Sequence, residues 1–166
     1  MTRSLHTPLP WQPGEVIGTS SWLVLDQRRI TAFGEITNDV EPLHTDPDWC
    51  RLHSPVGRPM SYGFLTLSLL TSFLHEVTGH ALAGSATSGS YPLNYGFDRI
   101  RFVSPVPVNS RVRGHFTFSE RRARSDGELL RFDVVVEIDG GERPALTAEW
   151  WSLWVPGTPP APPPAA

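Results

Sequence analysis

A carboxylate and an imidazole lie close together in the segment Asn38-Asp39-Val40-Glu41-Pro42-Leu43-His44. A short loop stiffened by Pro42 can direct the side chains of Asp39 and His44 toward one point, as general acid–base catalysis requires. The same residues also suit a structural arrangement, in which an Asx turn fixes the loop and the histidine packs locally. The spacing alone leaves both interpretations open.

A second candidate is the tripeptide Ser61-Tyr62-Gly63, which precedes a strongly apolar segment. If that segment is a helix, the backbone N–H of Gly63 lies at its positive end, and no side chain blocks the approach of a carbonyl oxygen. Glycine at a helix start can equally serve to relieve crowding. Ser61 and Tyr62 adjoin this position and are candidate substrate-binding residues together with Gly63.

The hydrophobic pattern predicts the elements that must hold these groups. Residues 61–78 are apolar on nearly all sides and end at Gly79, which predicts a helix buried at the centre of the fold. A strand is expected at residues 20–25. Four antiparallel strands are predicted by a period of two between turn signals, at residues 94–102, 111–120, 129–138 and 145–155.

Two short helices are expected on either side of the candidate pair. Asp26 is a suitable N-cap for a helix that runs toward Glu35. A second helix is expected after His44, where Thr45 or Asp46 can act as the cap and Pro47 lies early in the first turn. The apolar face of the first helix is expected to comprise Ile30, Phe33 and Ile36.

These elements suggest one architecture. Their apolar surfaces are all buried if a curved antiparallel sheet wraps around the long helix and the short helices overhang it. This α+β arrangement is the hot-dog fold, which we therefore expect.

Composition narrows the class of protein. With 166 residues, 39% of them hydrophobic, the chain suits one domain with its own core. We expect that domain at 15–155, between an extended arm at 1–14 and a disordered proline-rich tail at 156–166. A net charge of −3 argues against a nucleic-acid partner. Because we find neither a bilayer-length apolar run nor a signal-peptide pattern, we expect a cytoplasmic protein without a membrane partner.

Three other features suggest packing rather than chemistry. Cys50 is the single cysteine, so no internal disulfide is possible. The segment from His75 to His80 is similar to a zinc-protease motif but has one residue too many, so the two histidines lie on different faces and no metal site is expected. The tryptophans of the last strand are expected to pack in the core or at a dimer contact: Trp150, Trp151 and Trp154.

Several blocks of the sequence resemble the MaoC-like hydratase and dehydratase family, in the right order. Asp39, Pro42 and His44 match the spacing of its signature, in which Gly-Asp, any residue, Asn-Pro, an aliphatic residue and His follow one another. Residues 57–66 resemble the family's segment that ends in His-Gly before a central helix, and residues 94–108 resemble its next strand and turn. The resemblance covers residues 15–155 and is closest to the single-domain, NodN-like branch.

Three residues depart from the family pattern. Asn38 stands in place of glycine, Glu41 in place of asparagine, and Tyr62 in place of the histidine before Gly63. Glu41 adds a carboxylate near Asp39, which can raise the pKa of one of the two acids if both face the same pocket. The catalytic pair itself is retained.

The resemblance implies an enzyme that adds water to a trans-2-enoyl thioester to give an (R)-3-hydroxyacyl thioester, or the reverse dehydration. Asp39 and His44 would hold the water and shuttle a proton, and the Gly63 N–H would bind the thioester carbonyl. The substrate would be a thioester of coenzyme A or of an acyl carrier protein, and no metal or organic cofactor is expected. Because proteins of this family usually pair two units, a homodimer is also expected.

Two alternatives stay open. A thioesterase on the same fold would use an acidic residue of the central helix, for which Glu76 is the candidate. A non-catalytic protein of this fold would bind acyl thioesters or serve as the structural subunit of a heteromeric dehydratase. Such a subunit is expected to lack the Asp–His pair, which this chain retains.

Overall fold

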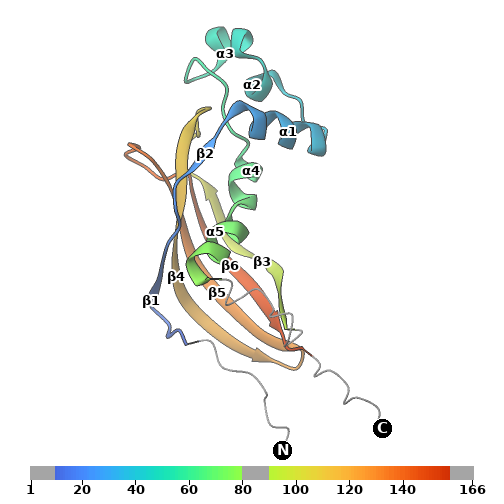
Figure 1. The fold of residues 1–166 in the computed structure, drawn as a ribbon, viewed down its shortest axis with the longest axis vertical. Helices are drawn as coiled ribbons and strands as arrows, with labels where there is room; N and C mark the ends of the chain where they lie inside the picture. The colour runs from blue at the N-terminus through green and yellow to red at the C-terminus, as the bar shows by residue number, and fades with distance from the viewer. Residues whose placement is uncertain (1–9, 80–89, 158–166) are drawn as a thin grey trace, which may run out of the picture.

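The computed structural model describes residues 10–79 and 90–157. Figure 1 shows a curved sheet with helices α4 and α5 along one of its faces and helices α1, α2 and α3 gathered beyond one end. Most of the expected arm and tail, and His80, lie outside the described residues. The arrangement confirms the expected hot-dog fold.

Six strands form one antiparallel sheet. Their order is β1-β4-β5-β6-β3, and β2 also pairs with β4, so β3 occupies one edge. The four predicted strands after the central helix are confirmed, with small shifts at their ends. The bounds are β1 Glu15–Thr19, β2 Leu23–Leu25, β3 Tyr91–Phe102, β4 Ser110–Arg124, β5 Gly127–Ile138 and β6 Leu146–Val155.

The strand expected at 20–25 is wrong at its start and misses β1. The hydroxyl of buried Ser20 accepts a hydrogen bond from the Gly114 N–H (3.0 Å), while the Ser20 N–H donates to the Gly114 carbonyl (2.9 Å). A side chain therefore takes the place of a carbonyl in the sheet ladder. At this point β1 ends, and the predicted strand covers only the gap after it and β2.

The short helices follow their capping residues. Helix α1 (Gln27–Thr37) begins after Asp26, whose side chain accepts from the Arg29 N–H (2.9 Å). Ile30 and Phe33 face the core as predicted, but Ile36 is 82% exposed, because Gly34 continues the buried face of this helix. Helix α3 (Pro47–His53) begins after Asp46 as expected. An additional short helix, α2 (Pro42–Thr45), lies where a loop was predicted.

The predicted helix at 61–78 is confirmed in part, because it begins at Gly63 and is divided into two helices at Leu69. Helix α4 (Gly63–Ser68) and helix α5 (Leu70–Thr78) meet at Leu69, and Gly79 ends α5 in the left-handed conformation. Hydroxyls on both sides of the break donate to backbone carbonyls three residues earlier, Ser68 to Leu65 and Ser72 to Leu69. Such bonds compete with the regular helical pattern.

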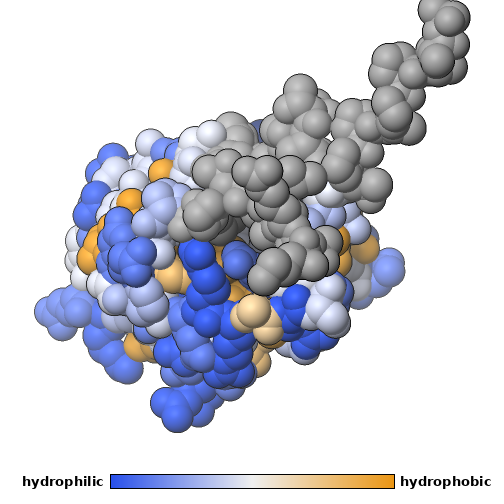
Figure 2. Space-filling view, turned by 90° about the horizontal axis from the view of Figure 1, so that it is seen from below, coloured by the Kyte–Doolittle hydropathy of each residue, from blue (hydrophilic) through white to orange (hydrophobic). Residues whose placement is uncertain are grey.

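The core lies between this helix pair and the sheet. Leu70, Phe73 and Leu74 are buried, whereas Phe64 is 68% exposed, so the helix pair is not buried on all sides. As predicted, the three tryptophans of β6 pack in hydrophobic clusters, Trp150 and Trp154 with the main core and Trp151 with Leu129 and Leu153. From the end opposite α1, α2 and α3, the visible surface is mostly hydrophilic, with small separate hydrophobic areas (Figure 2).

Candidate active site

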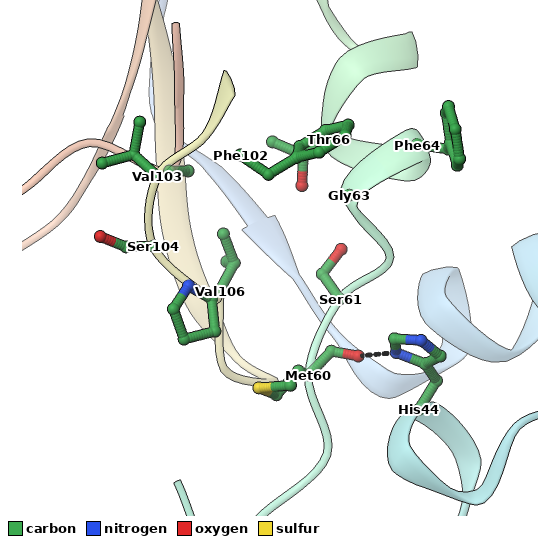
Figure 3. A pocket seen from close by; sticks show the side chains of 12 residues that line it. His44, Met60, Ser61, Gly63, Phe64, Thr66, Phe102, Val103, Ser104 and Val106 are labelled. Carbon is green, nitrogen blue, oxygen red and sulfur yellow. Dashed lines mark hydrogen bonds between the residues drawn. The ribbon is translucent and has the colours of Figure 1, made fainter. Parts of the chain in front are cut away.

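A cavity of about 400 Å³ opens where α4 begins, beside the end of β3. Figure 3 shows His44 and Ser61 on one side of it and Val103, Ser104 and Val106 on the other. The cavity brings together three of the five predicted site residues, His44, Ser61 and Gly63. Its lining comprises His44, Met60, Ser61, Gly63, Phe64, Thr66, Phe102, Val103, Ser104, Pro105, Val106 and Ala145.

The His44 imidazole is held in a defined orientation. Its Nδ1 lies 2.7 Å from the backbone carbonyl oxygen of Met60 (Figure 3). A carbonyl oxygen only accepts hydrogen bonds, so Nδ1 must carry the proton. In the neutral ring the other nitrogen, Nε2, then has a free lone pair. His44 is therefore prepared to accept a proton.

The backbone around His44 is anchored from three directions. From α1, the Gln27 amide donates to the His44 carbonyl (2.8 Å), and the Met60 N–H donates to the Leu43 carbonyl (3.2 Å). From α3, the buried Cys50 thiol lies 3.2 Å from the same Leu43 carbonyl. Burial raises the pKa of the Cys50 thiol, as Asp46 also does to a smaller degree, which keeps the thiol protonated as a donor.

Tyr62 lies behind His44 rather than in the cavity. It is 4% exposed, and its ring packs on the imidazole with centroids 3.8 Å apart. The Tyr62 hydroxyl donates a hydrogen bond to the backbone carbonyl of Asp39. Burial, followed by the charges of Asp39 and Glu41, raises the pKa of the Tyr62 phenol. The expected direct contact of Tyr62 with substrate does not fit this placement.

Asp39 follows the end of α1 in a regular helix-terminating motif. The Asn38 N–H donates to the Glu35 carbonyl (3.4 Å) and the Asp39 N–H to the Gly34 carbonyl (2.9 Å), with Asn38 left-handed at φ 57°. This conformation suits glycine and asparagine best, which explains why Asn38 can replace the family's glycine. The Asp39 side chain is exposed and is not among the residues that line the cavity.

Ser61 and Gly63 line the same side of the cavity as His44 (Figure 3). The Ser61 N–H donates to the Val106 carbonyl (2.8 Å), which fixes the segment before α4 against the chain beyond β3. A Cβ at Gly63 would lie 2.9 Å from the Phe102 ring, so this position requires glycine unless Phe102 moves. No side chain caps the start of α4. The Gly63 backbone is thus accessible at a helix start beside His44.

Glu76, the candidate catalytic residue of a thioesterase, forms a hydrogen bond away from the cavity. Its carboxylate accepts a hydrogen bond from the Ser21 N–H (2.7 Å), and the hydrogen bonds from Ser21 lower its pKa. It does not line the cavity beside His44. Within residues 10–79 and 90–157, no three histidine, cysteine or acidic side chains are grouped in a way that could hold a metal ion.

Comparison with known proteins places this geometry in context. The chain is 41% identical over 146 residues to Nodulation protein N of Rhizobium leguminosarum bv. viciae, covering 87% of this chain and 88% of that protein. It is 33% identical over 140 residues to 3-hydroxyacyl-thioester dehydratase Z of Mycobacterium tuberculosis, covering 82% and 86%. Its structure is similar to that of an (R)-hydratase from A. caviae involved in PHA biosynthesis, with a TM-score of 0.67, 22% identity, and coverage of 87% and 97%.

Residues 9–137 match the family described as MaoC like domain. The match covers more than half of the chain and includes the candidate pair, the start of α4 and most of the sheet. Together with the two relatives, it shows that this chain belongs to the MaoC-like dehydratase family.

Proposed function

We propose that this protein catalyses the reversible hydration of a trans-2-enoyl thioester to an (R)-3-hydroxyacyl thioester. The observation that carries the proposal is the orientation of His44, a residue that lines the cavity and whose Nδ1 donates to the Met60 carbonyl, which leaves Nε2 as the basic nitrogen. The names of a dehydratase relative and of an (R)-hydratase structural neighbour support this reaction class.

In the proposed reaction, Asp39 and His44 hold one water molecule beside the substrate. The water oxygen forms a bond to the β-carbon as Nε2 of His44 accepts its proton. The electrons of the carbon–carbon double bond move toward the thioester oxygen, where the Gly63 N–H stabilises the developing charge. Return of a proton to the α-carbon completes the addition, and the reverse sequence is the dehydration.

The proposed reaction needs only the substrate, water and the side chains and backbone of the protein. The thioester carbonyl activates the double bond, so neither a metal ion nor an organic cofactor is part of the proposal. The substrate is a thioester of coenzyme A or of an acyl carrier protein, and we propose that the reaction takes place in the cytoplasm. No helix in the described part of the chain is long and apolar enough to cross a membrane.

The test follows the ultraviolet absorbance of crotonyl-coenzyme A, and then of longer and branched enoyl thioesters. We expect the conjugated signal to be lost without release of free thiol. Asp39→Asn and His44→Gln are each expected to lower the rate by about 10²–10⁴-fold, the usual contribution of an acid–base pair. Matched controls come from α3, where exposed Asp48→Asn and His53→Gln make the same chemical changes and should leave the rate unaltered.

The alternatives predict different results in the same assay. Release of free thiol would identify a thioesterase, although the engagement of Glu76 with Ser21 argues against that role. A binding or structural subunit would retain the thioester without turning it over. Wild-type rates in both Asp39→Asn and His44→Gln would exclude the proposed mechanism.

A further inference from the structure

One buried side chain contacts both members of the proposed catalytic pair. The Tyr62 ring packs against Phe33 of α1, with centroids 5.3 Å apart, and against the imidazole of His44 in α2, with centroids 3.8 Å apart. Its hydroxyl donates to the Asp39 carbonyl. Asp39 and His44 are therefore held in relation to each other by the same residue.

Gly34 makes this arrangement possible. A Cβ at Gly34 would collide with the Tyr62 hydroxyl and would lie 2.6 Å from the Asp39 carbonyl oxygen. The glycine lies in the interior of α1, where it costs stability relative to alanine, so its presence calls for a local reason. The close approach of the tyrosine hydroxyl to the end of α1 supplies that reason.

We infer that Tyr62 is a positioning residue that fixes Asp39 relative to His44, and that Gly34 is its required counterpart. The inference rests on the proposed function. The hydroxyl holds the Asp39 backbone, and the ring limits the rotation of His44. Because acid–base catalysis depends steeply on geometry, loosening either contact is expected to slow the chemical step while substrate binding changes little.

The kinetic test is a double-mutant cycle with a substrate that the wild type turns over. Tyr62→Phe keeps the ring and removes the hydroxyl, and is expected to lower kcat about 10-fold while KM changes less than 2-fold. Gly34→Ala is expected to lower kcat at least as much. In the double variant the added methyl group no longer meets a hydroxyl but still meets the Asp39 carbonyl oxygen, so its kcat should be no higher than that of Gly34→Ala. Because both changes act on one contact, the combined loss in kcat should be smaller than the product of the two single losses.

A second measurement does not depend on activity. In protein labelled with ¹⁵N-histidine, the His44 resonances, assigned by their absence in His44→Gln, should show one form with Nδ1 protonated. Tyr62→Phe should keep this form because the ring is retained. Tyr62→Leu should give a mixture of forms because the imidazole loses its packing partner. Thermal unfolding checks that every variant is folded at the assay temperature.

The outcomes separate the inference from the proposed function. If the wild type is inactive but Tyr62→Leu alters the His44 resonances, the positioning role stands and the proposed reaction fails. If the wild type is active while Tyr62→Phe keeps kcat within 2-fold and Tyr62→Leu leaves the His44 resonances unchanged, the positioning role is overturned. Losses in kcat that multiply in the double variant also contradict it.

Discussion

At the scale of single residues, Asn38 shows how a departure from the family pattern can preserve the site. It adopts a left-handed conformation at φ 57°, directly before Asp39. Only glycine and, less readily, asparagine or aspartate adopt this conformation at low cost. The direction of the chain into the catalytic segment therefore depends on the residue type at position 38.

This dependence predicts the ranking of variants at that position. Asn38→Gly should change the free energy of unfolding by less than about 0.5 kcal/mol, whereas Asn38→Ala should cost about 1 kcal/mol, because alanine lacks the polar side chain that makes the left-handed region accessible to asparagine. Asn38→Val should cost more, because a β-branched side chain adds crowding. Urea unfolding of the three variants measures this ranking. Equal stability of the glycine and valine variants would show that the conformation is not maintained in solution.

The sequence predicted Asp39 and His44 from the spacing of a family signature, and Gly63 from its place before an apolar segment. It did not identify Gly34 or Gln27 as parts of the site. Both act through contacts formed only in the folded structure, for Gln27 with the backbone of His44 seventeen residues away. A glycine inside a predicted helix is unusual, so Gly34 could have been noticed in the sequence. The sequence does not show, however, that Tyr62 is the residue that packs against it.

At the scale of elements, sequence periodicity was informative where burial alternates regularly. Strand β4 buries every second residue over 112–118 and β5 does so over 130–138, so the alternating pattern located them well. Strand β6 alternates only at its start, because residues 150–153 are all buried. The break at Leu69 and the gap between β1 and β2 were not predictable in this way. Serine hydroxyls bond to backbone groups at both places, and the spacing of apolar residues carries no information about such bonds.

A hydrogen bond joins the segment between β1 and β2 to the last turn of α5. In it, the Glu76 carboxylate accepts from the Ser21 N–H. Hydrogen bonds from Ser21 lower the pKa of this carboxyl in the folded protein. A lowered folded-state pKa contributes stability above the unfolded value of about 4.3, and this contribution is lost as the pH falls through the folded-state pKa. The junction is therefore expected to loosen in acid.

Glu76→Gln tests this expectation because the amide can still accept the hydrogen bond without carrying a charge. At pH 7 the variant should be less stable than wild type by about 1 kcal/mol or less, since the carboxylate is exposed and screened by solvent. The difference should shrink toward zero below about pH 4, where the wild-type carboxyl becomes protonated. Urea unfolding across this pH range is the measurement, and a difference that does not vary with pH would contradict the proposed origin.

At the scale of the whole molecule, strand β3 forms an edge of the sheet with exposed apolar side chains. Among residues 10–79 and 90–157 it pairs only with β6, and an edge strand of this kind favours pairing with another chain. Phe64 of α4 lies beside Phe102 of this strand, with ring centroids 5.8 Å apart, and both line the cavity next to His44. The exposed apolar side chains of the strand are Tyr91, Leu93, Tyr95, Phe97 and Phe102.

We predict that two copies pair through β3 about a twofold axis and that the contact completes the cavity wall at Phe64 and Phe102. Light scattering should then give twice the chain mass of 18.4 kDa. Leu93→Lys, which places a charge on this edge, should give monomers with reduced activity. Val16→Lys makes the same change in the exposed β1 strand at the other edge and should remain dimeric and active. A monomeric, fully active wild type would refute the pairing, because the cavity would then be complete within one chain.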